Sequence, residues 1–276
     1  MKMTKRILMI MLVVIATAMG VNAETMTQKV YKVSAFNRIE VSSVIQVKYT
    51  QGSKYSVKVR YNEAGARIFC LKQSGNTIQA YVKEDPKRAR NSSYKIELYV
   101  TTPSLEYIGM SGSSTFTSGS ITQANRELTV AQSGASKFDV NQVCVKEIDL
   151  RNSGASTFKS YITAKEDVSI KNSGSATVSG TIKAKEVEIE CSGAAKVSGT
   201  INTTDLDIET SGAANIDIKG SAKNAEYYAS GSSHISASGL RAGKGEVKAS
   251  GAAKVNSNIG NLYKRETSGV ATITNR

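Results

Sequence analysis

The sequence predicts an all-β protein built as a parallel β-solenoid, a right-handed β-helix of about nine short rungs. Three observations predict it. The dipeptide Ser-Gly returns at intervals close to 20 residues, which is typical of stacked repeats. Apolar and polar residues alternate with a period of two, and no window holds a period of 3.6. Each interval also carries the same residue types at the same places. The dipeptides begin at Ser111, Ser133, Ser153, Ser173, Ser192, Ser211, Ser230, Ser250 and Ser268.

Positions after each Ser-Gly form two columns when the repeats are aligned. The fifth residue after the serine is always apolar: Phe116, Phe138, Phe158, Val178, Val197, Ile216, Ile235, Val255 and Ile273. The third residue after it is always small, Ser or Ala. These positions differ by two, so in a strand they face the same side. We therefore expect both columns to face the interior.

The strand before each Ser-Gly shows the same alternation. The third residue before the serine is apolar: Ile108, Val130, Leu150, Ile170, Ile189, Ile208, Tyr227 and Val247. Apolar residues also stand five positions before it, from Leu128 to Leu206. A leucine-rich repeat has a similar period, but its Leu-x-x-Leu-x-Leu frame and helical return are absent. Stacked parallel strands about 4.8 Å apart fit better, with right-handed crossovers.

The chain divides into three parts. Residues 1–23 read as a signal peptide, with Lys2, Lys5 and Arg6 before an apolar run too short to span a bilayer. An uncleaved anchor is the alternative. Residues 24–104 form an N-terminal β region, and residues 105–276 form the solenoid. After cleavage we expect an exported protein without a membrane span, in the periplasm, on the outer-membrane surface or secreted.

The N-terminal region carries longer alternating runs with turn signals between them. It is either a separate small β-domain or the wide first rungs of the coil, and both would cap the solenoid. Gln51-Gly52 and Ser74-Gly75-Asn76 predict hairpin turns. The expected strands are Phe36–Val41, Val44–Tyr49, Tyr55–Arg60, Thr77–Val82 and Tyr94–Thr101.

Charge is unevenly divided. The chain has a formal net charge of +13, and residues 24–110 hold 14 Lys and Arg against 7 Asp and Glu. The densest basic cluster is Lys83, Lys87, Arg88 and Arg90. Such a cluster can contact an anionic surface, although most charge runs are solvated loops. The sequence contains no recognised nucleic-acid-binding motif.

Carboxylates gather on the expected outer face of the strands before Ser-Gly: Glu188, Glu190, Asp207, Glu209 and Glu226. Lys183, Lys185 and Lys196 can balance them, which makes a solvated face the simpler interpretation. The sharper hypothesis is weak Ca²⁺ binding or a basic partner, because carboxylate oxygens are the ligands that Ca²⁺ prefers. No other cofactor is expected.

Catalytic residue types are scarce. The single histidine, His234, falls in an outward column without an oriented partner. Cys70, Cys144 and Cys191 are too few for a disulfide framework. We place Cys144 in a column with Ala164, Ala184 and Thr203, and Cys191 between Asn172 and Thr210. We expect Cys144 and Cys191 to be unlinked and the protein not to be an enzyme.

The order of several short elements resembles the head GIN domain family of auto-transporter adhesins. These elements are Phe36–Val41, then Ile45-Gln46-Val47 leading to Gln51-Gly52, then Val100–Leu105, and finally Met110-Ser111-Gly112. The resemblance covers roughly residues 33–276. It implies an exported bacterial β-helical protein with an adhesive role.

Three functions follow. The favoured one is a non-catalytic envelope or surface protein, an adhesin that binds a glycan or another surface ligand such as a protein. The alternative is a periplasmic partner in envelope stress or sensing. A polysaccharide-active enzyme is the least favoured, since the rungs vary by only a few residues and leave no loop long enough to wall a cleft.

Overall fold

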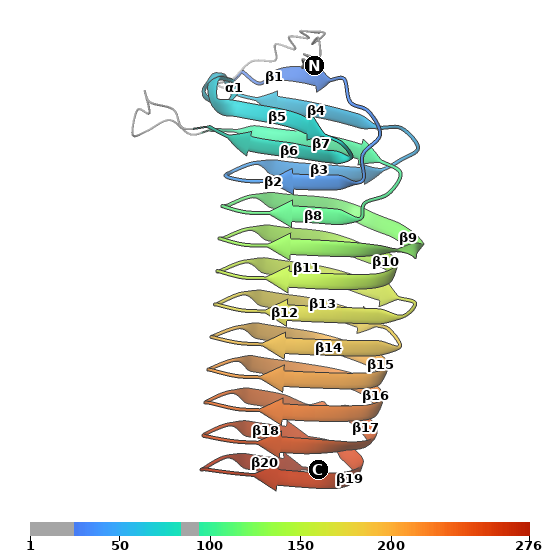
Figure 1. The fold of residues 1–276 in the computed structure, drawn as a ribbon, viewed down its shortest axis with the longest axis vertical. Coiled ribbons are helices and arrows are strands. Elements are labelled where there is room, and N and C mark those ends of the chain that lie inside the picture. Colours follow the sequence, from blue (N-terminus) through green and yellow to red (C-terminus); the bar gives the residue numbers. More distant parts are fainter. Residues whose placement is uncertain (1–24, 84–93) are drawn as a thin grey trace, which may run out of the picture.

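The computed structural model describes residues 25–83 and 94–276. The described chain is a rod of stacked strands with its two ends at opposite poles (Figure 1). Within it, twenty strands join into one continuous sheet, most of which winds into a right-handed parallel coil of about eight turns. The predicted fold class is therefore confirmed. The predicted signal peptide at residues 1–23, and the basic residues Lys87, Arg88 and Arg90, lie outside the described residues.

Each rung of the solenoid has a strand before Ser-Gly, a tight turn at that dipeptide and a strand after it. The strands are β8 (Tyr107–Met110), β9 (Thr115–Gln132), β10 (Lys137–Asn152), β11 (Thr157–Ala164), β12 (Asp167–Asn172), β13 (Thr177–Lys183), β14 (Glu186–Cys191), β15 (Lys196–Thr210), β16 (Asn215–Ala229), β17 (His234–Ala249), β18 (Lys254–Ser257), β19 (Ile259–Thr267) and β20 (Thr272–Asn275).

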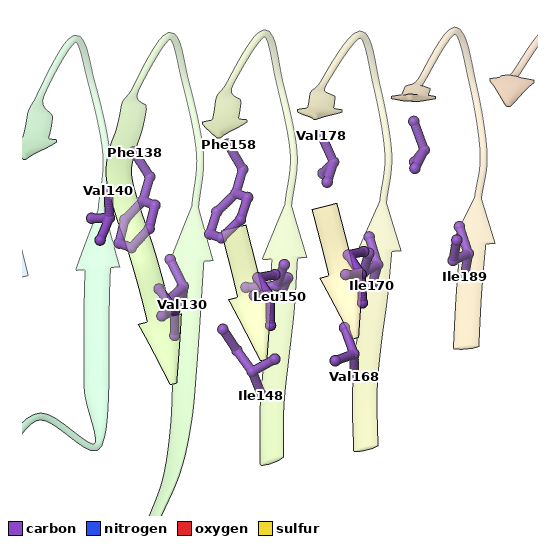
Figure 2. Close-up of a cluster of buried hydrophobic side chains, with 14 of the residues drawn as sticks. Val130, Phe138, Val140, Ile148, Leu150, Phe158, Val168, Ile170, Val178 and Ile189 are labelled. Atoms are coloured by element: carbon purple, nitrogen blue, oxygen red, sulfur yellow. The ribbon is translucent and has the colours of Figure 1, made fainter. Parts of the chain in front are cut away.

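The predicted columns stack in register. Phe138 lies opposite Phe116 on one side and Phe158 on the other. Their rings are parallel, with centroids 5.3 Å and 4.6 Å apart. The column continues in register to Ile273, and all nine of its members are buried. Figure 2 shows Phe138, Phe158 and Val178 of this column beside side chains of the strands before Ser-Gly in the interior. Like residues thus form a continuous apolar core along the rod.

The glycines after each serine also stack. Gly154 has a φ of +67°, which favours glycine. A Cβ atom there would stand 2.7 Å from the carbonyl oxygen of Gly134 in the preceding rung. The same two constraints recur at Gly134, Gly174, Gly193, Gly212, Gly231, Gly251 and Gly269. The column therefore requires glycine both for its conformation and for the close approach of successive turns.

The N-terminal region combines two arrangements. Strands β2 (Arg38–Val41) and β3 (Gln46–Gln51) pair in parallel with β8 and β9, and so extend the coil. Beyond them the chain turns antiparallel: β1 (Thr27–Tyr31) pairs with β4 (Ser56–Tyr61), and β4 pairs with β7 (Ile96–Thr102). β5 (Phe69–Ser74) and β6 (Thr77–Val82) form a hairpin, and α1 (Glu63–Ile68) precedes it. This region closes the end of the rod (Figure 1).

Two expectations about local pairing are wrong. The turn at Gln51-Gly52 does not close a hairpin, because β7 lies between β3 and β4 and pairs with both. Cys144 lies opposite Thr122 and Thr163, one position away from the column expected for it. The cause is an irregularity after Val140 that shifts the register of β10 against β11. Cys191 does lie between Asn172 and Thr210, and all three thiols are unpaired.

Among the residues that the structure describes, no helix has the length and apolar character needed to cross a membrane.

Candidate functional site

A groove runs along the outer side of the coil, beside the Ser-Gly turns. Its volume is about 910 Å³, and residues of β6, β2, β8, β9, β10, β12, β14 and β15 line it. A second hollow of about 390 Å³ follows over β15, β16, β17 and β19. Glu209 lines both hollows. The groove therefore follows the long axis of the rod past the turn of almost every rung.

The repeat itself creates the groove, because each rung contributes equivalent positions. The residue two before the serine points outward, the next one points into the core, and the serine stands at the start of the turn. The outward residues are Gln79, Glu40, Gly109, Ala131, Arg151, Lys171, Glu190 and Glu209. The serines are Ser42, Ser111, Ser133, Ser153, Ser173, Ser192 and Ser211.

The serine hydroxyls form a polar wall. Ser153 Oγ donates to the carbonyl of Gln132 at 3.2 Å, and Ser173 Oγ donates to that of Asn152 at 3.3 Å. Farther down, Ser230 Oγ donates to Thr210 O at 3.1 Å. A hydroxyl that has donated its one hydrogen keeps lone pairs that can accept. The wall thus offers acceptors at the spacing of the rungs.

The smallest residues on the groove floor are Gly109 and Ala131, which lie opposite each other in adjacent rungs. The Tyr107 ring lies over Gly109, where a Cβ atom would stand 2.8 Å from Tyr107 Cε1. The Arg38 guanidinium stacks over the same ring, 4.3 Å from its centroid. The Tyr107 ring therefore has its Cε1 and hydroxyl edge beside Gly109 and the Arg38 guanidinium over one of its faces.

Charged side chains border this part of the groove. Arg151 is fixed by Asp149, which accepts from Nε at 2.8 Å and lies 2.6 Å from Nη2. Lys171 Nζ lies 2.8 Å from Glu190 Oε1 in the next rung. On the other side of Gly109, Glu40 accepts from the Gln79 amide at 2.8 Å. The lining therefore combines paired charges, hydroxyls and apolar surface.

The five carboxylates predicted as an acidic patch do stack in register. Glu188, Asp207 and Glu226 form one column, and Glu190 and Glu209 form its neighbour. Partial burial of the Asp207 carboxyl, with repulsion from Glu226 and Glu188, raises its pKa. In the described part of the chain, no group of three or more His, Cys, Asp and Glu side chains could hold a metal ion. Ca²⁺ binding by this patch stays a prediction.

The other predicted residues lie away from the groove. Lys83 is exposed just after β6, and the rest of its basic cluster lies outside the described residues. His234 lies opposite Asn215 and Lys254 on the outer face of the strands that follow the turn. Neither lines the groove.

Sequence reasoning missed the groove. Its signal was present in the column two before each serine, where Gly109 and Ala131 stand between residues with long polar side chains. A hollow on a solenoid surface is created by such a local loss of side chains. The aligned repeats therefore show where the outward column has small residues, but not that the surface is hollow there.

A family model matches almost all of the described chain. It is described as "Putative auto-transporter adhesin, head GIN domain", and it matches residues 35–166 and again residues 158–276. No curated protein shows significant sequence similarity to the chain.

Solved structures share the fold. A putative adhesin from Bacteroides fragilis has a TM-score of 0.55 at 18% identity, covering 93% of this chain and 100% of the other. A putative lipid binding protein from Parabacteroides distasonis has a TM-score of 0.60 at 17% identity, covering 91% and 96%. A putative adhesin from the same species also scores 0.60, at 15% identity, covering 91% and 97%. At these identities the likeness establishes the fold alone.

Proposed function

We propose that this chain, which belongs to the head GIN domain family of putative auto-transporter adhesins, is a non-catalytic adhesin that binds a surface glycan in its groove. The family supports the coarser part of this function, an adhesin-like protein that is exported or on the surface. The choice of a glycan rests on the groove beside the Ser-Gly turns. That groove is the single observation on which the proposal depends.

A glycan fits the groove better than an extended peptide does. A bound peptide strand needs a free sheet edge, because its own backbone groups must be hydrogen-bonded. Along the groove, the backbone groups of each rung already pair with the rungs on both sides. What remains for a ligand is hydroxyls, carboxylates, a guanidinium and apolar surface. Sugars, which carry hydroxyls on an apolar ring, match this lining.

The lining favours binding over catalysis. Burial raises the pKa of the Cys191 thiol to about 12, so this thiol is not a thiolate nucleophile at neutral pH. His234, the only histidine in the sequence, does not line the groove.

A glycan array probed with the purified protein tests the proposal. We expect binding to a defined set of glycans, and loss of that binding in Ala131→Trp, whose side chain would fill the groove floor. Ser198→Trp is the matched control, because Ser198 is exposed on a strand segment that follows the turn and does not line the groove. Equal melting temperatures would show that both variants fold. Binding to no glycan, or binding unchanged in Ala131→Trp, would refute the proposal.

Protease treatment of intact cells tests where the protein resides. An adhesin is expected to be cleaved on intact cells, as a surface protein would be. Protection until the outer membrane is permeabilised would instead favour the periplasmic alternative, a partner in envelope stress or sensing.

A further inference from the structure

We infer that the ligand is a linear polymer that lies parallel to the rod axis and contacts about eight rungs at once. This inference rests on the proposed glycan-binding function and specifies the class of ligand. It contrasts with a single sugar or chain end held in one pocket.

The length and direction of the groove support a polymer. The larger hollow crosses eight strands that are neighbours along the axis. Seven steps of about 4.8 Å make a path of roughly 34 Å. The smaller hollow continues in the same columns past Tyr228, Lys248 and Glu266. A sugar unit in an extended glycan is about as long as one rung step, so successive units can meet successive rungs.

The repetition of the lining supports the same conclusion. Each rung offers at most one serine hydroxyl and one outward side chain, because β6 has Tyr81 in place of the serine and β8 has Gly109 in place of the side chain. One sugar unit could therefore make only one or two hydrogen bonds. Each such bond changes affinity by only roughly 2- to 10-fold. Useful affinity then requires several units bound together, as in multivalent binding.

The experiment measures affinity against chain length by calorimetry. The probes are oligosaccharides of two to ten units from four series: cello-, manno-, chito- and galacturonate oligosaccharides. In any series that binds, we expect Kd to fall by several-fold per added unit, up to about eight units. Two variants block the groove in different places: Ala131→Trp in β9 and Glu209→Trp in β15. Ser198→Trp is the control outside the groove.

The variants separate the two forms of binding. For eight-unit probes we expect both blocking variants to weaken binding more than 10-fold, because a long ligand passes both positions. For the shortest probes that bind, at most one blocking variant should matter. An affinity that is already maximal with two or three units would overturn the inference and leave the proposed function standing. No binding in any series, together with an empty glycan array, would overturn both.

Discussion

The solenoid and the N-terminal cap (residues 25–104) use the same alternating strands but assemble them differently. In the solenoid every strand pairs in parallel with the equivalent strand of the next rung. In the cap, β4 runs antiparallel to both β1 and β7, and β5 runs antiparallel to β6. A parallel coil can always add another rung, whereas antiparallel strands that turn back on themselves stop the stack. The difference shows that repetition and closure need different local sequences.

The solenoid and the cap also differ in the residue that occupies the tight turn of each rung. In the solenoid each turn glycine has another turn glycine above it, too close for a side chain. At the junction with the cap, Ser43 takes the place of glycine with a φ of +70°. Gly112 lies directly below Ser43. A side chain is therefore tolerated only where the glycine column begins.

The largest expected effect breaks the solenoid core. Phe158→Asp should unfold the protein or lower its stability by more than about 5 kcal/mol, because it buries an unpaired charge between Phe138 and Val178. Val30→Asp, at a half-exposed position of β1 in the cap, should change stability by less than about 0.5 kcal/mol. Denaturant unfolding followed by circular dichroism measures both. A Phe158→Asp protein as stable as the wild type would contradict the inward column.

The next largest effect on stability distinguishes the strain of a positive φ from the close approach of stacked turn glycines. Gly154→Ala should cost about 3 kcal/mol or more, because it adds a clash with Gly134 to the strain of a positive φ. Gly75→Ala is the matched variant in the cap: its φ is +57°, but no atom lies within 4 Å of the added Cβ. It should cost only about 1–2 kcal/mol. Equal costs in urea unfolding would show that turn stacking adds nothing.

A smaller effect has the opposite sign. Ser43→Gly should raise the free energy of unfolding by about 0.5–1 kcal/mol, since glycine removes the cost of a positive φ and adds a smaller entropic cost in the unfolded chain. Ser42→Gly, at the neighbouring residue, should instead destabilise by about 0.5–1 kcal/mol. Paired chemical denaturation curves of the two variants measure this difference. If Ser43→Gly is as destabilising as Ser42→Gly, the strain at Ser43 is absent.

The sequence predicts the solenoid more completely than the cap, because only the solenoid repeats its residue pattern. In the solenoid, the column that holds Tyr227 has eight members in the sequence, so one atypical residue does not obscure its place. Cys144 was misplaced because the spacing between irregular bends is not repeated. In the cap, the strand Thr77–Val82 was predicted to the residue. Its antiparallel pairing across the turn at Ser74-Gly75-Asn76 was also predicted. Its parallel pairing with β2 was not, because alternation shows which face is buried but not which strand lies beside it. α1 and the bounds of β5 were missed, since neither element belongs to a repeat.

The candidate site was harder to predict for a related reason. The register placed the acidic residues together, as stacking of the aligned repeats implies. The groove instead depends on how the Tyr107 ring packs over Gly109 and under Arg38. Those three residues come from two strands that are distant in sequence and neighbours in the coil. Aligned columns give the position of each residue, but rotamers and cross-strand packing decide where the surface is hollow.

The smallest expected effect concerns the outer face of the strands, where carboxylates of successive rungs lie opposite each other and repel. Asp207 has Glu188 and Glu226 as its cross-strand neighbours, and like charges in such positions are destabilising. Asp207→Asn should therefore stabilise the protein by about 0.5 kcal/mol at pH 7 and low salt. Asp217→Asn is the control, because Asp217 lies between Ser198 and Ser236.

The stability gained by Asp207→Asn should depend on pH. The pKa of Asp207 is raised in the folded protein, so folding favours the protonated acid, and ionisation of this group lowers stability as pH rises. The advantage of Asp207→Asn should thus be full at neutral pH and should vanish as pH falls through the raised pKa towards the ordinary value of 3.8. Added NaCl should also reduce it, because salt screens exposed charges. Thermal unfolding of both variants between pH 3 and pH 8 measures the trend. A gain that persists at pH 3 would mean that the amide stabilises by another route than relief of repulsion.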